Sequence, residues 1–244
     1  MYKIENTRTV DMKNLGAQYE NLDQKVYQVV KQMIEDRTLL PGQKIPQEKL
    51  AKDLGVSRTP LISALKFLEH EKLIEVKPRR GFFVRLFTIN EMIGIFEIRE
   101  VLEGLAARRA AQCITDKECR ELEGLFKNFK GYANITDMSG YSKADRKFHT
   151  MITGIASREF LATMLQTFDI ISLAYQNVSS EGLIRHPNDT IEDHEKIIEA
   201  ICSRDSDQAE TLMRAHFKGA IDILKEQIDE ESKQNHSKEV INHD

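Results

Sequence analysis

The sequence predicts a mainly α-helical protein of two domains, a small N-terminal domain with three helices and a β-hairpin and a larger all-helical bundle. Its 244 residues suit two domains of moderate size. Three helical patterns precede two short strand patterns within residues 22–86, whereas almost every apolar pattern after residue 88 has the helical period. Residues 22–86 carry 13 Lys and Arg against 8 Asp and Glu, a net charge of +5, whereas the chain beyond residue 86 carries −9.

Residues 1–20 lack a sustained period and are expected to form a flexible arm. Apolar residues recur every three or four positions from Leu22, and this helix should end before Pro41, whose ring stops a helix. A second helix is expected over 47–54. Gly55 follows it at the position where a helix end tolerates the left-handed conformation.

The third helix is predicted from Ser57, its N-cap, to about residue 71, with Pro60 allowed in the first turn. Strands are expected at 73–76 and 82–86, joined by a turn in a β-hairpin. Three helices followed by a hairpin is the element order of a winged helix-turn-helix domain.

The rest of the chain reads as helix. Thr88, Thr115 and Asp205 are expected to cap helices. The predicted helices are 90–112, 116–131, 138–155, 158–178, 187–203 and 206–232. The predicted domain division is a flexible arm (1–20), a winged helix-turn-helix domain (21–87), an all-helical effector, metal-binding and dimerisation domain (88–232) and a flexible tail (233–244).

Composition excludes several classes of protein. No apolar run approaches the ~18 residues that cross a bilayer, and the N-terminus lacks the apolar core of a secretory signal. A cytoplasmic protein without membrane contact is therefore expected. The three cysteines have no CxxC spacing, so they are predicted to be apolar filler rather than a disulfide framework or a thiolate zinc site.

Two groups of residues in the N-terminal domain are predicted to contact double-stranded DNA. The second helix of a helix-turn-helix presents its N-terminal residues to the major groove, where an arginine can bind a guanine or a phosphate and hydroxyls suit phosphate oxygens. A wing tip with arginines and a glycine can enter a minor groove or bind phosphate. The alternative is solvated surface charge. The predicted DNA-binding residues are Ser57, Arg58, Thr59, Arg79, Arg80 and Gly81.

The segments LPGQKI, LAKDLGVSRTP and LKFLEHEKLIEVKPRRGFFV resemble the winged helix of the GntR family of bacterial transcription regulators. The resemblance covers residues 22–86. Two departures stand out: Ile62-Ser63 replaces an Arg-Glu pair of the family, and Gln47 replaces a glutamate. Because the missing arginine usually contacts DNA, the resemblance does not carry over an operator sequence.

A second constellation lies in the helical half. Asp145 and His149 are four residues apart, so a helix places them on one face. His194 and His216 lie beside the apolar stripes of two later helices. Three imidazoles and one carboxylate form a borderline ligand set that suits Zn, Ni, Mn or Fe, although each histidine taken singly could be an ordinary core or surface residue. The other four histidines are predicted to be surface residues: His70, His186, His236 and His243.

Residues 90–232 resemble the FCD-type effector domain of the FadR subfamily, through IREVLEGLAARRAA, DRKFH, EDHEKIIEAI and MRAHF. The resemblance implies that Asp145, His149, His194 and His216 bind a divalent transition metal in the centre of the bundle. Asp193 stands where the family commonly has Glu, next to a ligand.

The resemblance also implies a small carboxylate effector that binds at the metal. Arg99 would face the same cavity and could pair with that anion, or it could form an ion pair with Glu103, four residues on. Both alternatives stay open at this point.

The predicted function is a ligand-responsive, homodimeric transcription regulator, a repressor by preference, that reads a pseudo-palindromic operator. The protein is not expected to be an enzyme. A metal-dependent hydrolase on a helical bundle is the alternative from another class, but the chain has no HExxH motif and no evident general base beside the ligands. A metal-free regulator that senses acyl thioesters is a third possibility.

Overall fold

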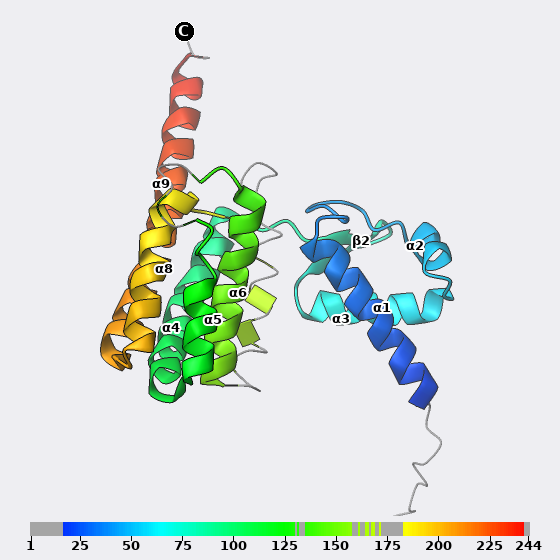
Figure 1. Cartoon of the computed structure of the whole chain (residues 1–244). Coiled ribbons are helices and arrows are strands. Elements are labelled where there is room, and N and C mark those ends of the chain that lie inside the picture. The colour runs from blue at the N-terminus through cyan, green and yellow to red at the C-terminus, as the bar shows by residue number, and fades with distance from the viewer. Residues whose placement is uncertain are drawn as a thin grey trace, which may run out of the picture. The chain divides into compact units, whose positions relative to one another are not determined.

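A computed structural model of the chain describes residues 17–129, 131, 135–157, 161, 164–165, 167–168, 171 and 183–241. The chain divides after Arg85 into two compact units. Figure 1 shows a first unit of three helices with a small hairpin and a second unit of helices. The elements of the first unit are α1 (Ala17–Glu35), α2 (Gln47–Asp53), α3 (Arg58–His70), β1 (Ile74–Lys77) and β2 (Gly81–Val84).

The turn between α2 and α3 has the predicted form. Gly55, which follows the C-cap residue Leu54 of α2, adopts a left-handed φ of +65°, and the N–H of Val56 donates to the carbonyl of Ala51 at 3.0 Å. The left-handed glycine lets the backbone turn back and satisfy a carbonyl at the end of α2. Ser57 is the N-cap residue of α3, with extended backbone and no capping hydrogen bond from its side chain. α1 begins at Ala17, earlier than the predicted Leu22.

The core of the first unit is the predicted face of leucines together with residues of α1. Leu61, Leu65 and Leu68 on α3 are fully buried, and so is Val30 on α1, which packs against α3. Burial of these side chains supplies the main favourable free energy for a unit of this size. The orientation of α3, and hence of its exposed N-terminus, depends on this contact.

The hairpin is antiparallel, and Ile74 pairs with Val84 and Val76 with Phe82. The segment before α2 adds a third short pairing that the sequence analysis did not predict. Lys44 forms a bridge with Phe83, and the N–H of Ile45 donates to the carbonyl of Phe82 at 2.9 Å. Backbone hydrogen bonds therefore join the hairpin to the segment that precedes α2.

The second unit is built around α4, which packs along α9 and also contacts α6 and α8. Among the described residues, no helix combines the length and the apolar character that a membrane-spanning segment needs. The structure confirms the predicted mainly helical fold class, a winged helix-turn-helix followed by a helical bundle. The elements are α4 (Ile89–Cys113), α5 (Asp116–Gly124), α6 (Met138–Ala156), α8 (Pro187–Cys202) and α9 (Ser206–Ile241).

The three predicted caps of the second unit are confirmed. Thr88 accepts a hydrogen bond from the N–H of Glu91, whose carboxylate accepts from the N–H of Thr88 at 2.9 Å. Thr115 forms the same reciprocal capping box at the start of α5. Asp205 accepts from the N–H of Gln208 at 3.0 Å, at the start of α9. Each cap satisfies backbone N–H groups that have no partner within the helix.

Two predicted helices of the second unit end elsewhere in the structure. α5 ends at Gly124 instead of residue 131, because the chain continues in turns with i→i+3 bonds, such as Phe129 N–H to Phe126 O at 2.9 Å. α9 continues to Ile241, beyond the predicted end at residue 232. Most of the predicted helix 158–178, the arm up to residue 16 and residues 242–244 lie outside the described residues.

Candidate metal centre and nucleic-acid interface

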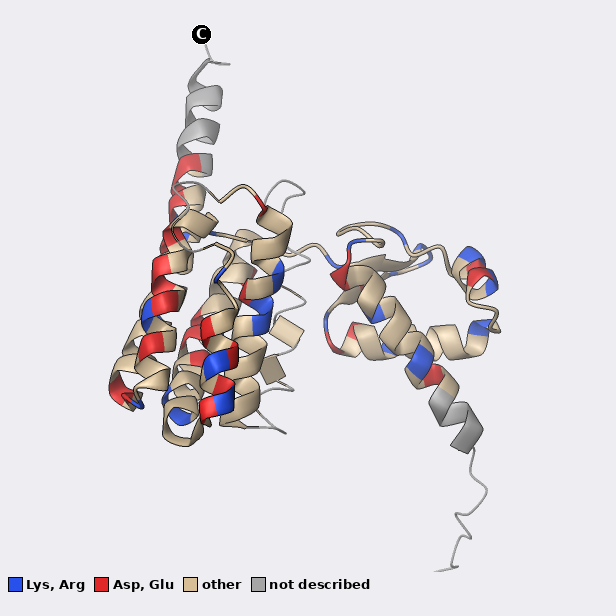
Figure 2. Ribbon diagram, in the orientation of Figure 1, with Lys and Arg blue, Asp and Glu red and all other residues tan. Residues whose placement is uncertain are grey.

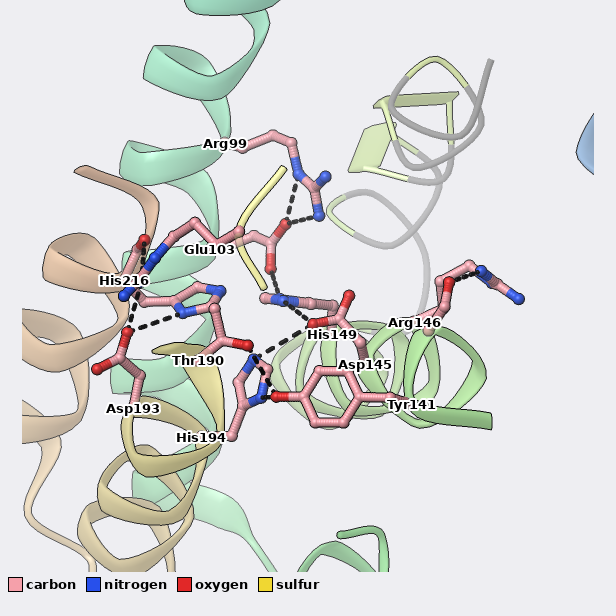
Figure 3. A network of polar contacts seen from close by, with 12 residues as sticks. Arg99, Glu103, Tyr141, Asp145, Arg146, His149, Thr190, Asp193, His194 and His216 are labelled. Carbon is pink, nitrogen blue, oxygen red and sulfur yellow. Dashed lines mark hydrogen bonds and ion pairs between the residues drawn. The ribbon is translucent and has the colours of Figure 1, made fainter. Parts of the chain in front are cut away.

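Three helices of the second unit bring three histidines together in its interior. His149 on α6, His194 on α8 and His216 on α9 are buried, and one ligand atom from each lies within 4.8 Å of the others. We call these three residues the histidine cluster (Figure 3). Asp145, one helical turn before His149, places Oδ1 3.3 Å from His194 Nε2 and 4.0 Å from His149 Nε2. The structure thus brings all four predicted ligands together.

A polar chain orients His194. Its Nδ1 lies 3.0 Å from the Tyr141 hydroxyl, which lies 2.8 Å from the Thr190 hydroxyl. With the proton on Nδ1, the imidazole donates to Tyr141 and leaves the lone pair of Nε2 toward the other ligands. In the part of the chain that the structure describes, this buried Nε2 has no hydrogen-bond partner. A buried polar atom without a partner is costly, and a metal ion would satisfy it.

A buried ion pair orients His149. Its Nδ1 bonds Glu103 on α4, and Arg99 holds the same carboxylate with Nε at 2.8 Å and Nη2 at 2.7 Å (Figure 3). Burial opposes ionisation of Glu103, but the charges of Arg99 and His149 outweigh it and lower the pKa of this carboxyl. His149 Nδ1 therefore faces a carboxylate, and Nε2 is left to face Asp145.

The third imidazole has a carboxylate partner at the edge of the cluster. His216 Nδ1 lies 3.4 Å from Asp193 Oδ2, and Arg185 Nη1 lies 2.6 Å from the same oxygen. Nδ1 of each clustered imidazole is thus engaged by a neighbour. Outer partners of this kind fix the tautomer and orientation of metal-binding histidines.

The pKa values within the cluster favour neutral imidazoles at two positions. Burial, together with the neighbouring imidazoles, lowers the pKa of His194 well below its ordinary value. Burial likewise lowers the pKa of His216. Burial also opposes protonation of His149, but the adjacent Glu103 carboxylate outweighs it and raises the pKa of His149. Because only the neutral ring offers a lone pair to a metal, the first two imidazoles are prepared for coordination.

The donor set fits a divalent transition metal. Three imidazole nitrogens and a carboxylate oxygen are ligands that Zn, Ni, Mn and Fe accept. His194 Nε2, which makes no hydrogen bond among the described residues and lies beside the Asp145 carboxylate, and the engaged Nδ1 atoms are what such a centre requires of the surrounding protein.

Of the two alternatives expected for Arg99, the structure shows the ion pair. Arg99 forms an ion pair with Glu103, and its guanidinium carbon lies 4.9 Å from the centre of the Phe217 ring and 5.5 Å from that of Phe96. The side chain is buried.

Several residues of the site were not identified in the sequence. Tyr141 precedes Asp145 and His149 at intervals of four, and this spacing places all three on one helix face, a signal that could have revealed it. Contacts of Glu103 and Arg185 with the cluster join separate segments of the chain, and no local spacing indicates them.

The remaining histidines and the cysteines are mixed in outcome. His70 and His186 are both exposed as predicted, and His186 also caps α8 by accepting from the N–H of Asn188 at 3.2 Å. The side chains of His236 and His243 lie outside the described residues. All three cysteines are free, and Cys113 is exposed rather than core filler.

The predicted major-groove residues lie exposed at the start of α3. Ser57, Arg58 and Thr59 all face solvent. The Arg58 side chain is 66% exposed, and its one ion pair among the described residues is with the exposed Glu48, at 3.6 Å. A surface ion pair of this kind adds little free energy, so Arg58 can exchange it for a DNA phosphate or base at small cost.

The predicted wing residues lie at the tip of the hairpin. Arg79 and Gly81 have left-handed φ values of +61° and +97°, which form the tight turn. A Cβ at Gly81 would lie 3.1 Å from Gln47 Nε2, so glycine allows a close approach there. Arg80 is exposed and its guanidinium lies 5.4 Å from the Phe83 ring centre. Figure 2 shows basic residues on this unit and acidic residues along the described part of α9.

A winged helix with an exposed basic recognition helix, joined to a helical unit, defines a two-domain DNA-binding regulator of transcription. Residues 22–84 match the family described as "Bacterial regulatory proteins, gntR family", and residues 94–219 match the FCD domain. The chain belongs to the GntR family of transcription regulators, in the FadR-like group that carries an FCD domain.

Relatives of similar length agree with this assignment. The chain is 30% identical over 191 residues to the Nta operon transcriptional regulator of Aminobacter aminovorans, covering 77% of this chain and 87% of that protein. It is 25% identical over 201 residues to the HTH-type transcriptional repressor RspR of Escherichia coli, covering 80% and 86%. A putative GntR regulator from Rhodococcus sp. RHA1 has the same fold, with a TM-score of 0.69 and 17% identity over 84% of this chain and 97% of that one. The protein is thus a DNA-binding transcription regulator and not an enzyme, and the hydrolase alternative is set aside.

Proposed function

We propose that this protein is a metal-containing, effector-responsive repressor that binds a pseudo-palindromic operator as a homodimer. The observation that carries the proposal is the convergence of the histidine cluster and Asp145 inside the unit that follows the winged helix. RspR is a repressor by name, which supports the same sign of regulation here.

The metal would be held by Nε2 of His149, His194 and His216 and by the Asp145 carboxylate. Bound there, a divalent ion would supply a Lewis-acid position for an oxygen ligand. The chain contributes the rest: it excludes bulk water by burying the imidazoles, and it fixes their orientation through polar partners on Nδ1.

The effector in this proposal is a small carboxylate. A carboxylate is a suitable ligand for a metal position that the protein leaves open. Arg99 would reach such an anion only by exchanging Glu103, so the metal is the primary contact and Arg99 a secondary one. The effector alters DNA affinity only to the extent that it binds two states of the protein differently.

Exposed apolar residues on α4 support the dimer. Ile98, Val101 and Leu105 lie on one face of the helix, at spacings of three and four, and each is at least 40% exposed. An apolar stripe of this kind on a soluble helix is typical of an interface. A two-fold axis between copies would present two α3 helices to successive major grooves.

The metal content of the purified protein tests the proposal. We expect about one divalent ion per chain by inductively coupled plasma mass spectrometry, and its loss in His194→Ala. Thermal-shift screening of small carboxylates should reveal ligands that raise the melting temperature only when metal is present. Operator affinity, measured by fluorescence anisotropy, should change when such a ligand is added. A protein without metal that is stabilised by acyl thioesters would instead establish the metal-free alternative.

A further inference from the structure

Two of the clustered imidazoles are oriented by the same arrangement of side chains, in which an arginine pairs with a carboxylate and the carboxylate contacts Nδ1 of the imidazole. The arrangement at His149 is deeply buried. The arrangement at His216 lies nearer the surface and consists of Arg185 and Asp193. Only this second arrangement includes a residue from the segment that precedes α8.

Asp193 needs a partner in addition to His216 to keep its orientation. Its side chain is 31% exposed, whereas that of Glu103 in the first arrangement is 1% exposed. A partly exposed carboxylate can turn to water, and its contact with His216 Nδ1 is long, at 3.4 Å. The shorter contact of 2.6 Å from Arg185 Nη1 is therefore the interaction that holds Asp193 Oδ2 beside the imidazole.

Arg185 contacts backbone carbonyls of both α8 and α9. Nη2 donates to the carbonyl of Asp189 on α8 at 2.7 Å, and Nη1 lies 3.4 Å from the carbonyl of His216 on α9. Gly219 on α9 leaves room for the guanidinium in this position. A Cβ built on Gly219 would lie 3.0 Å from Arg185 Nη1 and 3.1 Å from Cζ, closer than ordinary van der Waals contact.

We propose that Arg185 is a positioning residue of the metal centre, that it acts on His216 through Asp193, and that Gly219 provides the surface on which its guanidinium lies. The inference rests on the proposed metal-binding function. In metalloproteins, the loss of such an outer partner typically lowers metal affinity tenfold to a hundredfold.

The test compares full-length variants of matched type. Arg185→Ala removes the positioning group, and Arg185→Lys keeps the charge without the two-pronged geometry. Gly219→Ala displaces the guanidinium without removing a ligand or a charge. Gly154→Ala is the control, since it adds the same methyl group to α6, the helix of His149, at a position with no atom within 4 Å. Zn²⁺ affinity is measured by competition with a chelator, and the visible spectrum of the Co²⁺ form reports ligand geometry.

We expect Arg185→Ala and Gly219→Ala to bind Zn²⁺ about tenfold or more weakly, with an altered Co²⁺ spectrum, and Arg185→Lys to recover part of the affinity. The melting temperature of metal-free Gly219→Ala should stay close to that of the wild type, because the higher helix propensity of alanine offsets the disturbed contacts of Arg185. The inference is wrong if both variants keep wild-type affinity and spectrum, or if Gly154→Ala loses as much. If the wild-type protein itself binds no metal, the proposed function fails as well. Should Arg185→Ala not fold, Gly219→Ala and Arg185→Lys decide the matter.

Discussion

Each clustered imidazole is oriented by a polar side chain from another helix. The partners are Glu103 for His149, Tyr141 for His194 and Asp193 for His216. A ring nitrogen that is engaged in this way leaves the opposite nitrogen for the centre. The site is thus defined by pairs of residues, and removing either member of a pair should weaken metal binding.

Tyr141→Phe tests the partner of His194 without altering a proposed ligand. The variant leaves Nδ1 of a fully buried imidazole without its hydrogen bond. We expect the affinity for Zn²⁺ to fall roughly tenfold to a hundredfold, as measured by competition with a chelator. Tyr27→Phe, in the other unit, is the control and should bind metal normally. Unchanged affinity in Tyr141→Phe would show that the hydroxyl does not orient the ring.

Helix ends in this protein are fixed by short local motifs. The boxes Thr88–Glu91 and Thr115–Glu118 start α4 and α5 with reciprocal hydrogen bonds. The first of these also determines where α4 begins, three residues after the division between the two units. Local motifs therefore set the boundaries of the helix that carries Arg99 and Glu103.

Thr88→Ala removes one side of the α4 box. A lost N-cap of this type costs about 1 kcal/mol of stability. We expect the melting temperature of the helical unit to fall by roughly 2–4 °C, measured by circular dichroism on metal-free protein. Thr88→Ser, which keeps the hydroxyl, should melt close to the wild type. An equal loss in both variants would mean that the methyl group, and not the cap, stabilises this end.

The two units carry opposite charge, and only the first is built to meet a polyanion. Arg58 at the start of α3 and Arg80 at the wing tip belong to the same unit and both face solvent. The acidic residues of the second unit disfavour contact with DNA there. The protein is therefore expected to bind DNA through its winged helix alone.

Arg58→Ala tests the recognition helix in the whole protein. Loss of an arginine contact to a base costs about 1–3 kcal/mol. We expect at least a tenfold weaker specific complex, measured by fluorescence anisotropy on an operator selected from random duplexes. Lys117→Ala, an exposed basic residue of the helical unit, should leave affinity unchanged. Equal affinities of Arg58→Ala and the wild type would contradict the proposed reading mode.

Val101→Glu tests the proposed dimer. A charge in the exposed α4 stripe would have to be buried against a second copy without a partner. We expect a monomer by light scattering coupled to size-exclusion chromatography, with weaker operator binding because two half-sites are no longer linked. Val101→Leu preserves the apolar surface and should remain dimeric. A dimeric Val101→Glu protein would place the interface elsewhere.

Much of the architecture was readable from sequence because it rests on local signals. Gly55 at a helix end, Thr88 and Thr115 at helix starts and the leucine face of α3 each act within a few residues. The clearest miss is the short pairing of Lys44 with Phe83, which joins segments far apart in the chain. The end of α5 was placed too late because turns with i→i+3 bonds keep a nearly helical spacing of apolar residues.

By itself, the sequence determined the division of charge between the two units and the winged helix with Arg58 exposed at the start of α3. Through its resemblance to the FCD domain, it also indicated the four residues that come together inside the bundle. Only the tertiary structure decided which neighbours orient those residues: Glu103, Tyr141 and Arg185 contact the cluster or its partners from other segments. The physical reason is range. Periodicity and capping depend on residues within one or two helical turns. The direction of an imidazole lone pair depends on hydrogen bonds between helices, which form only when the helices pack.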